Sequence, residues 1–357
     1  MKKYILHLTL LLSLTLNFEP GTSNLFAQDI HFAMYDAVPM LTNPATTGIF
    51  NGDHRGVINY RNQWANIGRP YVTYSVNIDG GFFKHKWKNG YLGMGLGAYK
   101  DVAGESQLGI TKINLSLSSI VYLDNKNSGA VGLMGSWVQN SMNPENLRWD
   151  VQFDGQQYNP ALSSNEAFTF ESTNYFDFSA GALWTYGTGT KTLSSHDELA
   201  SKAGIAFYHV TRPDQQINFG EIDKLYSKWA FHSESYIGIS NSRLAIVPKL
   251  LVYVQGPTRE ITLGTLFRYL LRDESLYTGL LKEMAVSMGG YYRVGDAFVP
   301  SIEFELSSFA IGFSYDLNLS GLTVASNGNG GPEIFIRIIN PNPFQYGRGN
   351  RSSARFR

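Results

Sequence analysis

Residues 308–320 read SFAIGFSYDLNLS and alternate strictly between two kinds of side chain. One set is large and apolar (Phe309, Ile311, Phe313, Tyr315, Leu317 and Leu319), and the other is small or polar (Ala310, Gly312, Ser314, Asp316, Asn318 and Ser320). Alternation by twos indicates a β-strand with one apolar and one polar face. A soluble sandwich would bury the large set. A barrel in an outer membrane would turn it toward lipid and line its lumen with the small polar set.

The composition favours the barrel. Charged residues make up 16% of the 357 residues, against roughly 25% in soluble domains. The chain also has 21 Tyr, 22 Phe and 36 Gly, which suits alternating strands joined by polar turns. It has no cysteine, which excludes disulfides, thiolate metal sites and cysteine nucleophiles.

The N-terminus has the features of a secretory signal peptide. Lys2 and Lys3 precede an apolar run at residues 6–16, and Ala27 precedes Gln28 at the expected cleavage site. The run is too short for a membrane anchor, which needs about 20 residues. We therefore predict export and a cleaved signal peptide at residues 1–27. Its removal leaves a net charge of −1, which gives no support for nucleic-acid binding.

The mature chain contains a series of strand-like segments, most of them near the length that crosses a bilayer at a tilt. They lie at 55–64, 71–79, 91–101, 110–122, 129–139, 175–186, 201–210, 228–240, 243–254, 259–270, 284–294, 297–306, 308–319 and 332–339. No stretch after residue 28 approaches the 18 apolar residues of a helical span. We predict an all-β transmembrane barrel of about 14 antiparallel strands at residues 51–339, located in the outer membrane.

The connections between these segments differ in length. Short polar sequences at 79–81, 88–90 and 124–127 predict hairpin turns. Residues 140–174 and 211–227 form much longer polar connections, which usually face outward in such barrels. A third connection, at 271–283, is long enough to carry a short helix.

Three segments lie outside the strand pattern, and one of them is a Gly- and Asn-rich loop at residues 320–331. Residues 28–50 are polar and contain prolines, and we predict a periplasmic or plug-like segment in the barrel mouth. Residues 340–357 have a charge of +4 and no acid, and their composition predicts disorder. The basic residues of this tail are Arg348, Arg351, Arg355 and Arg357. The tail is either a solvated terminus or an electrostatic attachment to a negatively charged periplasmic or lipid surface.

Motifs at the start of the mature chain resemble one family of membrane proteins. Residues 28–48 read QDIHFAMYDAVPMLTNPATTG, and residues 60–64 read YRNQW. These motifs resemble the Q-D, F-x-x-Y, P-x-x-x-N-P-A-x-x-G and Y-R-x-Q-W of the PorP/SprF outer-membrane proteins. Residues 95–104 and 315–322 also resemble segments of that family, so the resemblance runs from residue 28 to about 339. The long 140–174 connection, the 271–283 connection and the arginine tail depart from the pattern and leave open which member it resembles most.

The resemblance implies a function in the type IX secretion and gliding motility system of Bacteroidetes-type bacteria. It implies a non-enzymatic barrel that binds or positions a large secreted surface adhesin or the periplasmic secretion machinery. The long 140–174 connection favours the adhesin as partner, since it is a natural specificity element. A passive channel or small-molecule transporter is the alternative interpretation, and its mark would be an open polar lumen.

The resemblance also supplies candidate partner-binding residues, each with a plainer interpretation. These candidates are Asn43, Pro44, Tyr60, Arg61, Gln63 and Trp64. The positive charge of the tail, which is not part of the resemblance, adds its four arginines. The Asn-Pro pair is also a common turn initiator, and Tyr60 and Trp64 also suit a strand end at the bilayer interface. We expect Arg61 to face the lumen and to be paired, because a lipid-facing charge costs about 2–4 kcal/mol.

Signals for an enzyme are weak. The seven histidines are scattered, without an H-x-x-x-H or H-E-x-x-H pair, and no G-x-S-x-G motif occurs. His232 and Glu234 share a strand face, as do Glu303 and Glu305. These pairs could be metal ligands or an acid and a base, but ionic networks in the lumen are the favoured interpretation. We expect no catalytic residue, metal, cofactor or small-molecule substrate; the expected partners are proteins and outer-membrane lipid.

Overall fold

The computed structural model describes residues 29–84, 86–143, 147–165, 172–188, 198–215, 223–272, 283–306 and 308–340. The predicted signal peptide and all four arginines of the tail lie outside these residues, as do residues 273–282 of the 271–283 connection. The domain boundaries drawn from the sequence stay predictions.

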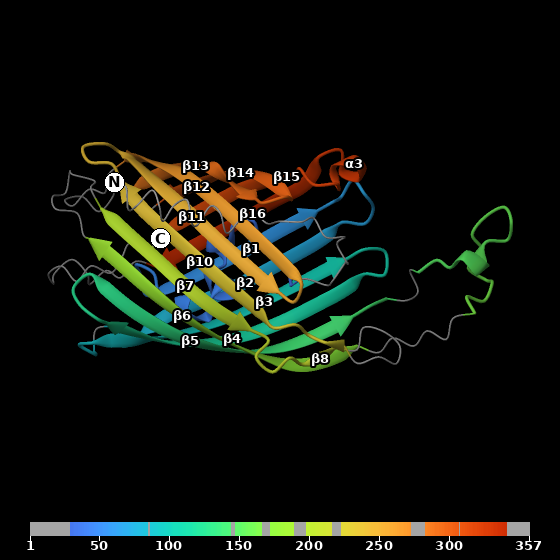
Figure 1. Cartoon of the computed structure of the whole chain (residues 1–357), viewed down its shortest axis with the longest axis horizontal. Helices are drawn as coiled ribbons and strands as arrows, with labels where there is room; N and C mark the ends of the chain where they lie inside the picture. Colours follow the sequence, from blue (N-terminus) through green and yellow to red (C-terminus); the bar gives the residue numbers. More distant parts are fainter. Residues whose placement is uncertain are drawn as a thin grey trace.

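The described chain folds into a closed barrel of 14 antiparallel strands (Figure 1). The strands are β1 (His54–Gln63), β2 (Tyr71–Phe82), β3 (Gly90–Ala103), β4 (Leu108–Tyr122), β5 (Asn127–Ser141), β6 (Thr173–Thr188), β7 (Leu199–Tyr208), β10 (Lys228–Gly238), β11 (Leu244–Gln255), β12 (Thr258–Arg272), β13 (Met284–Arg293), β14 (Ala297–Leu306), β15 (Phe309–Asn318) and β16 (Asn329–Asn340). Each strand pairs with its neighbours in the chain, and β1 closes the barrel against β16. A separate two-residue ladder joins β8 (Asp214–Gln215) and β9 (Asp223–Lys224). The prediction of about 14 antiparallel strands is confirmed.

In residues 308–320 the large apolar side chains face outward and the small or polar ones face inward, as expected of a membrane barrel. On β15, Phe313 is 45% exposed and its neighbour Ser314 is fully buried. The same inversion holds on β6, where Phe176 and Phe178 are exposed and Asp177 between them is buried. A soluble sandwich would show the opposite arrangement, so the barrel interpretation is confirmed.

One predicted turn is wrong. Residues 79–81 were expected to reverse the chain, but β2 continues through them to Phe82, with Gly80 opposite Met94 and Gly81 opposite Gly93. The glycines lie at close approaches rather than at a turn. A Cβ on Gly80 would lie 3.0 Å from the backbone carbonyl oxygen of Asp53, and one on Gly81 would lie 2.0 Å from the flexible end of the Lys84 side chain. The closing strand also begins earlier than predicted, at Asn329, after the short helix α3 (Thr323–Ser326).

The two ends of the barrel are different. We call the end where β1 begins and β16 ends the terminus end, since His54 pairs with Asn340 there. The opposite end, here the loop end, carries the long connections between β5 and β6 and between β7 and β10. The described part of the first, residues 147–165, contains the 3-10 helix η4 (Asp150–Gln152) and extends far from the barrel body (Figure 1).

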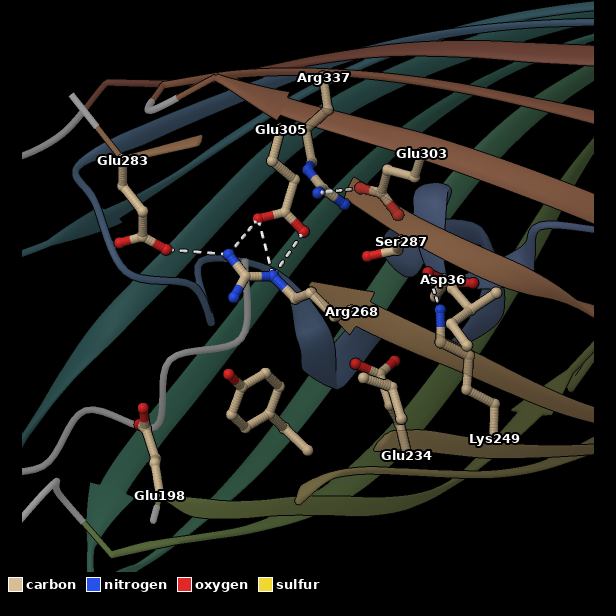
Figure 2. A pocket seen from close by; sticks show the side chains of 13 residues that line it. Asp36, Glu198, Glu234, Lys249, Arg268, Glu283, Ser287, Glu303, Glu305 and Arg337 are labelled. Atoms are coloured by element: carbon tan, nitrogen blue, oxygen red, sulfur yellow. Dashed lines mark hydrogen bonds and ion pairs between the residues drawn. The ribbon is translucent and has the colours of Figure 1, made fainter. Parts of the chain in front are cut away.

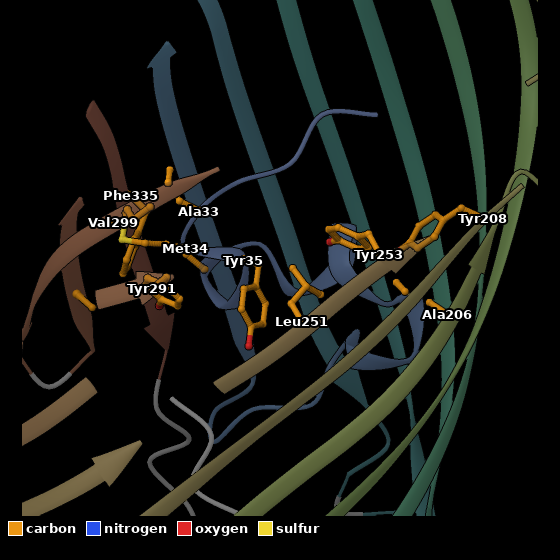
Figure 3. Packing of buried hydrophobic residues seen from close by; sticks show 14 of the residues in the cluster. Ala33, Met34, Tyr35, Ala206, Tyr208, Leu251, Tyr253, Tyr291, Val299 and Phe335 are labelled. Atoms are coloured by element: carbon orange, nitrogen blue, oxygen red, sulfur yellow. The ribbon is translucent and has the colours of Figure 1, made fainter. Parts of the chain in front are cut away.

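The barrel is filled by the N-terminal segment, which we define as residues 29–50. It contains the short helices η1 (Tyr35–Ala37), α2 (Pro39–Thr42) and η2 (Pro44–Thr46), and nearly all of it is buried. Side chains of this segment pack against inward-facing residues from many strands (Figure 3). The packed core therefore lies between the N-terminal segment and the barrel wall. Among the described residues, no helix has the length and apolar character needed to cross a bilayer.

Candidate functional site in the barrel interior

The N-terminal segment begins at a charged cluster near the loop end. The carboxylate of Asp29 lies 2.7 Å from Nε2 of His209 and 3.3 Å from Nζ of Lys228. Nδ1 of His209 lies 3.0 Å from Oδ2 of Asp177, which also accepts a hydrogen bond of 3.0 Å from Lys112. His209 therefore bridges a carboxylate of the segment and a carboxylate of the wall.

The charges in this cluster shift the pKa values of their partners. Burial lowers the pKa of His209, but the carboxylates of Asp29 and Asp177 outweigh it and raise the pKa above its ordinary value. Burial raises the pKa of Asp29, but the positive charges of His209 and Lys228 outweigh it and hold the pKa well below its ordinary value. An ionised Asp29 beside a protonated imidazole is therefore the favoured state of this contact.

The next contact is made by the backbone of the segment. Glu333 on β16 is fully buried, and its two carboxylate oxygens accept hydrogen bonds from the amides of Ala33 (2.8 Å) and Met34 (3.0 Å). Arg61 lies 3.6 Å from Glu333 and 2.7 Å from Asp316. Arg61 is thus inward-facing and paired, as the sequence predicted.

Asp36 connects the middle of the segment to the opposite wall. Its carboxylate lies 2.6 Å from Nζ of Lys249 and accepts a hydrogen bond of 2.8 Å from the hydroxyl of Tyr291. Tyr35 packs edge-on against the ring of Tyr291, with ring centres 6.1 Å apart. Burial raises the pKa of Asp36, but Lys249 and the hydrogen bonds outweigh it and lower the pKa to about 2.

Asn43 is completely buried and bonds to three strands. Its side-chain nitrogen donates to the carbonyls of Ala182 (3.1 Å) and Ile205 (3.3 Å) and lies 3.0 Å from Nε2 of His232. Its side-chain oxygen accepts from the amide of Ala45 at 2.8 Å and so caps η2. A Cβ on Gly181 would lie 2.0 Å from that oxygen, so the wall is shaped to this side chain.

The segment leaves the lumen through a second set of bonds to β2 and β4. The carbonyl of Thr47 accepts from Ser118 at 2.6 Å, and the amide of Gly48 donates to Asp79 at 2.7 Å. Asp79 is also paired with Arg55 at 2.7 Å. The wall thus contacts the segment at points spread along its length, which makes it an integral part of the barrel interior.

A charged cavity opens between the segment and the wall at the terminus end, and we call it the vestibule (Figure 2). The empty space between its lining residues is about 620 Å³, and part of this space is open to solvent. Its carboxylates are Asp36, Glu198, Glu234, Glu283, Glu303 and Glu305, and its cations are Lys249, Arg268 and Arg337. Arg268 pairs with Glu305 at 2.7 Å and with Glu283 at 2.9 Å, and Arg337 pairs with Glu303 at 2.6 Å.

Of the histidine and glutamate pairs singled out in the sequence, the three glutamates belong to ionic networks and His232 does not. Glu303 and Glu305 face the vestibule with separate arginine partners, while Glu234 pairs with Lys202 at 2.9 Å and His232 contacts Asn43. The prediction of ionic networks in the lumen is confirmed. Within the described residues, no group of three or more histidine and acidic side chains is arranged to hold a metal ion.

The predicted partner-binding residues do not form one cluster. Asn43 and Pro44 are buried against β6, β7 and β10, while Arg61 lies across the lumen among β1, β15 and β16. Tyr60, Gln63 and Trp64 lie near the loop end of β1, where Trp64 packs edge-on against Tyr71 with ring centres 5.0 Å apart. A partner role for these residues stays a prediction.

Sequence reasoning missed the residues that hold the segment. These are Asp29, Asp36, Asp79, Lys249 and Glu333. A signal for the last three was present, because each is a charge on the inward face of an alternating strand, where a partner is required.

A closed barrel with an apolar outer surface and an ionic, chain-filled interior defines an outer-membrane β-barrel protein. The chain belongs to the PorP/SprF family, described as type IX secretion system membrane protein, whose model matches residues 24–338. It is therefore a secretion-related barrel of the outer membrane, with partners among the components of that system.

Solved structures of other barrels are similar at low sequence identity. The CymD monoaromatic hydrocarbon channel is 14% identical, with 86% of this chain and 92% of that chain covered and a TM-score of 0.46. A Pseudomonas aeruginosa FadL homologue is 10% identical, with 83% and 91% covered and a TM-score of 0.45. The P. putida toluene transporter TodX is 9% identical, with 83% and 91% covered and a TM-score of 0.40. No curated protein matches the sequence.

Proposed function

We propose that the protein is a non-enzymatic component of type IX secretion that binds and positions a secreted surface protein of the gliding-adhesin type at its loop end. The observation that carries this proposal is the N-terminal segment bonded across the lumen. A barrel filled in this way is a rigid scaffold, and rigid scaffolds that carry long loops are suited to binding.

The connection between β5 and β6 supplies the binding surface. Its described part is folded on itself, since Phe153 pairs with Tyr158 and Nε2 of Gln152 donates to the carbonyl of Leu162 at 3.0 Å. Val151 is nevertheless 53% exposed and Phe153 55% exposed. Large apolar side chains held at the tip of a projecting loop favour contact with another protein.

The even strand number puts both termini at the same end of the barrel, and because long loops usually face outward in such barrels, we infer that the loop end lies outside the cell and the terminus end in the periplasm. In this orientation the projecting loop meets a secreted protein, and the vestibule faces the secretion machinery. The machinery is therefore the second expected partner, at the opposite end of the same scaffold.

The alternative function, a passive channel, requires a continuous path through the lumen. The N-terminal segment and its ionic contacts occupy the space that such a path would use. Conduction would therefore require the segment to leave its partners, which makes binding the better-supported function.

Affinity purification of the tagged protein from detergent-solubilised outer membranes, followed by mass spectrometry, tests the proposal. We expect to recover a large secreted surface protein, and to lose it when Val151, Phe153 and Leu162 are all replaced by serine. Val324→Ser is the matched control, because Val324 is 90% exposed at the same end but lies outside the projecting loop.

Two results would contradict the proposal. One is equal recovery of the surface protein by the triple variant and the control. The other is a barrel without any protein partner that conducts ions in planar bilayers, which would establish the channel instead.

A further inference from the structure

We propose that the loop-end part of β6, residues 173–179, is an open sheet edge that binds an extended segment of the secreted surface protein as an additional antiparallel strand. This inference rests on the proposed function and deepens it, since it states the conformation and the chemistry of the bound segment. The edge adjoins the projecting loop, because the connection between β5 and β6 leads directly into it.

The edge exists because β6 is longer than the strand beside it. β6 has 16 residues and β7 has 10. On one side β6 pairs with β5 over residues 173–186, but on the other side it pairs with β7 only over residues 180–188. Residues 173–179 therefore form a stretch of strand, about 23 Å long, that continues past the end of β7.

The backbone groups of this stretch point alternately toward β5 and away from it. In an antiparallel strand the amide and the carbonyl of one residue point to the same side, and the side alternates along the chain. The amide of Gly187 donates to Lys126 next to β5, whereas the carbonyl of Phe178 accepts from Val210, just after β7. Even-numbered residues of β6 therefore point away from β5. At Asn174 and Phe176 no described strand lies on that side, and their backbone groups have no partner there among the described residues.

The edge is a fixed feature because His209 ends β7. Its backbone is left-handed, with a φ of 56°, a conformation that does not continue a strand and that such residues seldom adopt. The ring of His209 is held between Asp29 and Asp177. The ionic contact of the N-terminal segment thus keeps β7 from extending along β6. The next strand, β8, approaches β6 but forms its ladder with β9.

The side chains of the edge favour contact with another chain. Phe176 is 68% exposed and Phe178 is 51% exposed. Unpaired peptide groups do not occur in contact with hydrocarbon, so this part of β6 rises above the bilayer, where its amides are accessible. Edges that avoid partners usually carry lysine, proline or a bulge. Residues 173–179 contain no lysine or proline, and their register with β5 is regular.

The free backbone groups determine the kind of occupant. Donors and acceptors that recur at every second residue are matched by an extended chain, which is the basis of strand addition. Aromatic or β-branched side chains on that chain would pack beside Phe176 and Phe178. A second copy in the same membrane could present its β6 only in parallel orientation, which is the less stable pairing. We therefore assign the segment to the surface protein that meets the projecting loop.

Hydrogen exchange at single-residue resolution tests the edge directly. In the full-length barrel refolded in detergent, the amides of Asn174 and Phe176 should exchange at least about tenfold faster than those of Tyr175 and Asp177, which point toward β5. In the barrel purified together with its surface protein, the two fast amides should slow by at least about tenfold. Equal exchange of all four amides in the free barrel, or no change in the complex, would overturn the proposal.

A proline variant separates backbone pairing from side-chain contact. Asn174→Pro with Phe176→Pro removes both free amides, and its barrel should fold because proline is tolerated where the amide of an edge strand has no partner. Asn174→Ala with Phe176→Ala removes the same side chains but keeps the amides, and it is the matched control. Heat-dependent gel mobility checks that both barrels are folded. Affinity purification should recover at least about tenfold less surface protein with the proline variant.

The outcomes distinguish this inference from the proposed function. Equal recovery of the surface protein by the proline and alanine variants would overturn strand addition and leave the proposed function standing. A wild-type barrel that recovers no surface protein would contradict both. The exchange measurement uses the unaltered chain, so it decides the question even if the proline variant fails to fold.

Discussion

Oδ2 of Asp36 lies 2.6 Å from Nζ of Lys249, and this contact joins the N-terminal segment to a strand 213 residues further along the chain. The pair lies between the packed core and the vestibule, and the hydroxyl of Tyr291 completes it. The segment is held by such partners rather than by a helix or sheet of its own. This arrangement makes its attachment testable one contact at a time.

Lys249→Ala should be strongly destabilising, because it leaves the buried carboxylate of Asp36 without its cation. Removing one partner of a buried pair costs about 3–5 kcal/mol. The free energy of unfolding, measured by urea titration in detergent with tryptophan fluorescence, should fall by about 3–5 kcal/mol. Lys126→Ala, in an exposed turn, is the control. Asp36→Asn combined with Lys249→Met should recover much of the loss, and a single variant as stable as the control would show that the pair contributes little.

The contact between His209 and Asp29 should make attachment of the N-terminal segment depend on pH. The folded-state pKa of His209 is raised, so its contribution is fully present below the ordinary value near 6.5 and is lost as the pH rises through the raised value. The pKa of Asp29 is lowered, so its contribution is present above about 3.8 and is lost as the pH falls through the lowered value.

Hydrogen exchange of residues 29–34, corrected for the intrinsic effect of pH, measures this dependence. Protection should decrease from pH 6 toward pH 9, and His209→Gln should remove the dependence in that range. Protection in the wild type that stays constant over the range would show that His209 does not hold the segment.

Gly181→Ala should displace Asn43, because the added Cβ would lie 2.0 Å from the side-chain oxygen of Asn43. Overpacking of this kind costs about 1–3 kcal/mol. Gly135→Ala is the matched control, since its Cβ would meet only the ring of Phe178, at 3.6 Å. Unfolding titrations should give a lower free energy of unfolding for Gly181→Ala than for Gly135→Ala. Adding Asn43→Ala to both variants should reduce this difference in free energy. Equal stability of the two glycine variants would disprove tight packing at this point.

Phe313→Arg should destabilise the barrel by about 2–4 kcal/mol in lipid, because Phe313 faces outward at mid-strand and a charge there must enter the bilayer. Phe313→Leu keeps the position apolar and is the control. Reversible folding into lipid vesicles measures both variants. A charge tolerated as well as leucine would show that this face of β15 is not in contact with lipid.

The strands were predictable because their signal is local. Alternation such as Phe313 beside Ser314 reports directly which face of a strand meets lipid, and low charge with no cysteine favours the same class of protein. The predicted turn at residues 79–81 failed because glycine has two uses. Gly80 lies inside β2 close to the backbone carbonyl of Asp53, and no neighbouring residue distinguishes that use of glycine from a turn.

The sequence by itself determined the class of fold, the strand number and the requirement that inward charges such as Arg61 be paired, because each depends on periodicity or on the cost of an unpaired charge. Only the tertiary structure decided which groups are paired. Asp29 and Asp36 are ordinary acids of a polar segment in the sequence, and their partners His209 and Lys249 lie 180 and 213 residues away. Strand register and barrel closure bring these groups together, and no local pattern encodes either one.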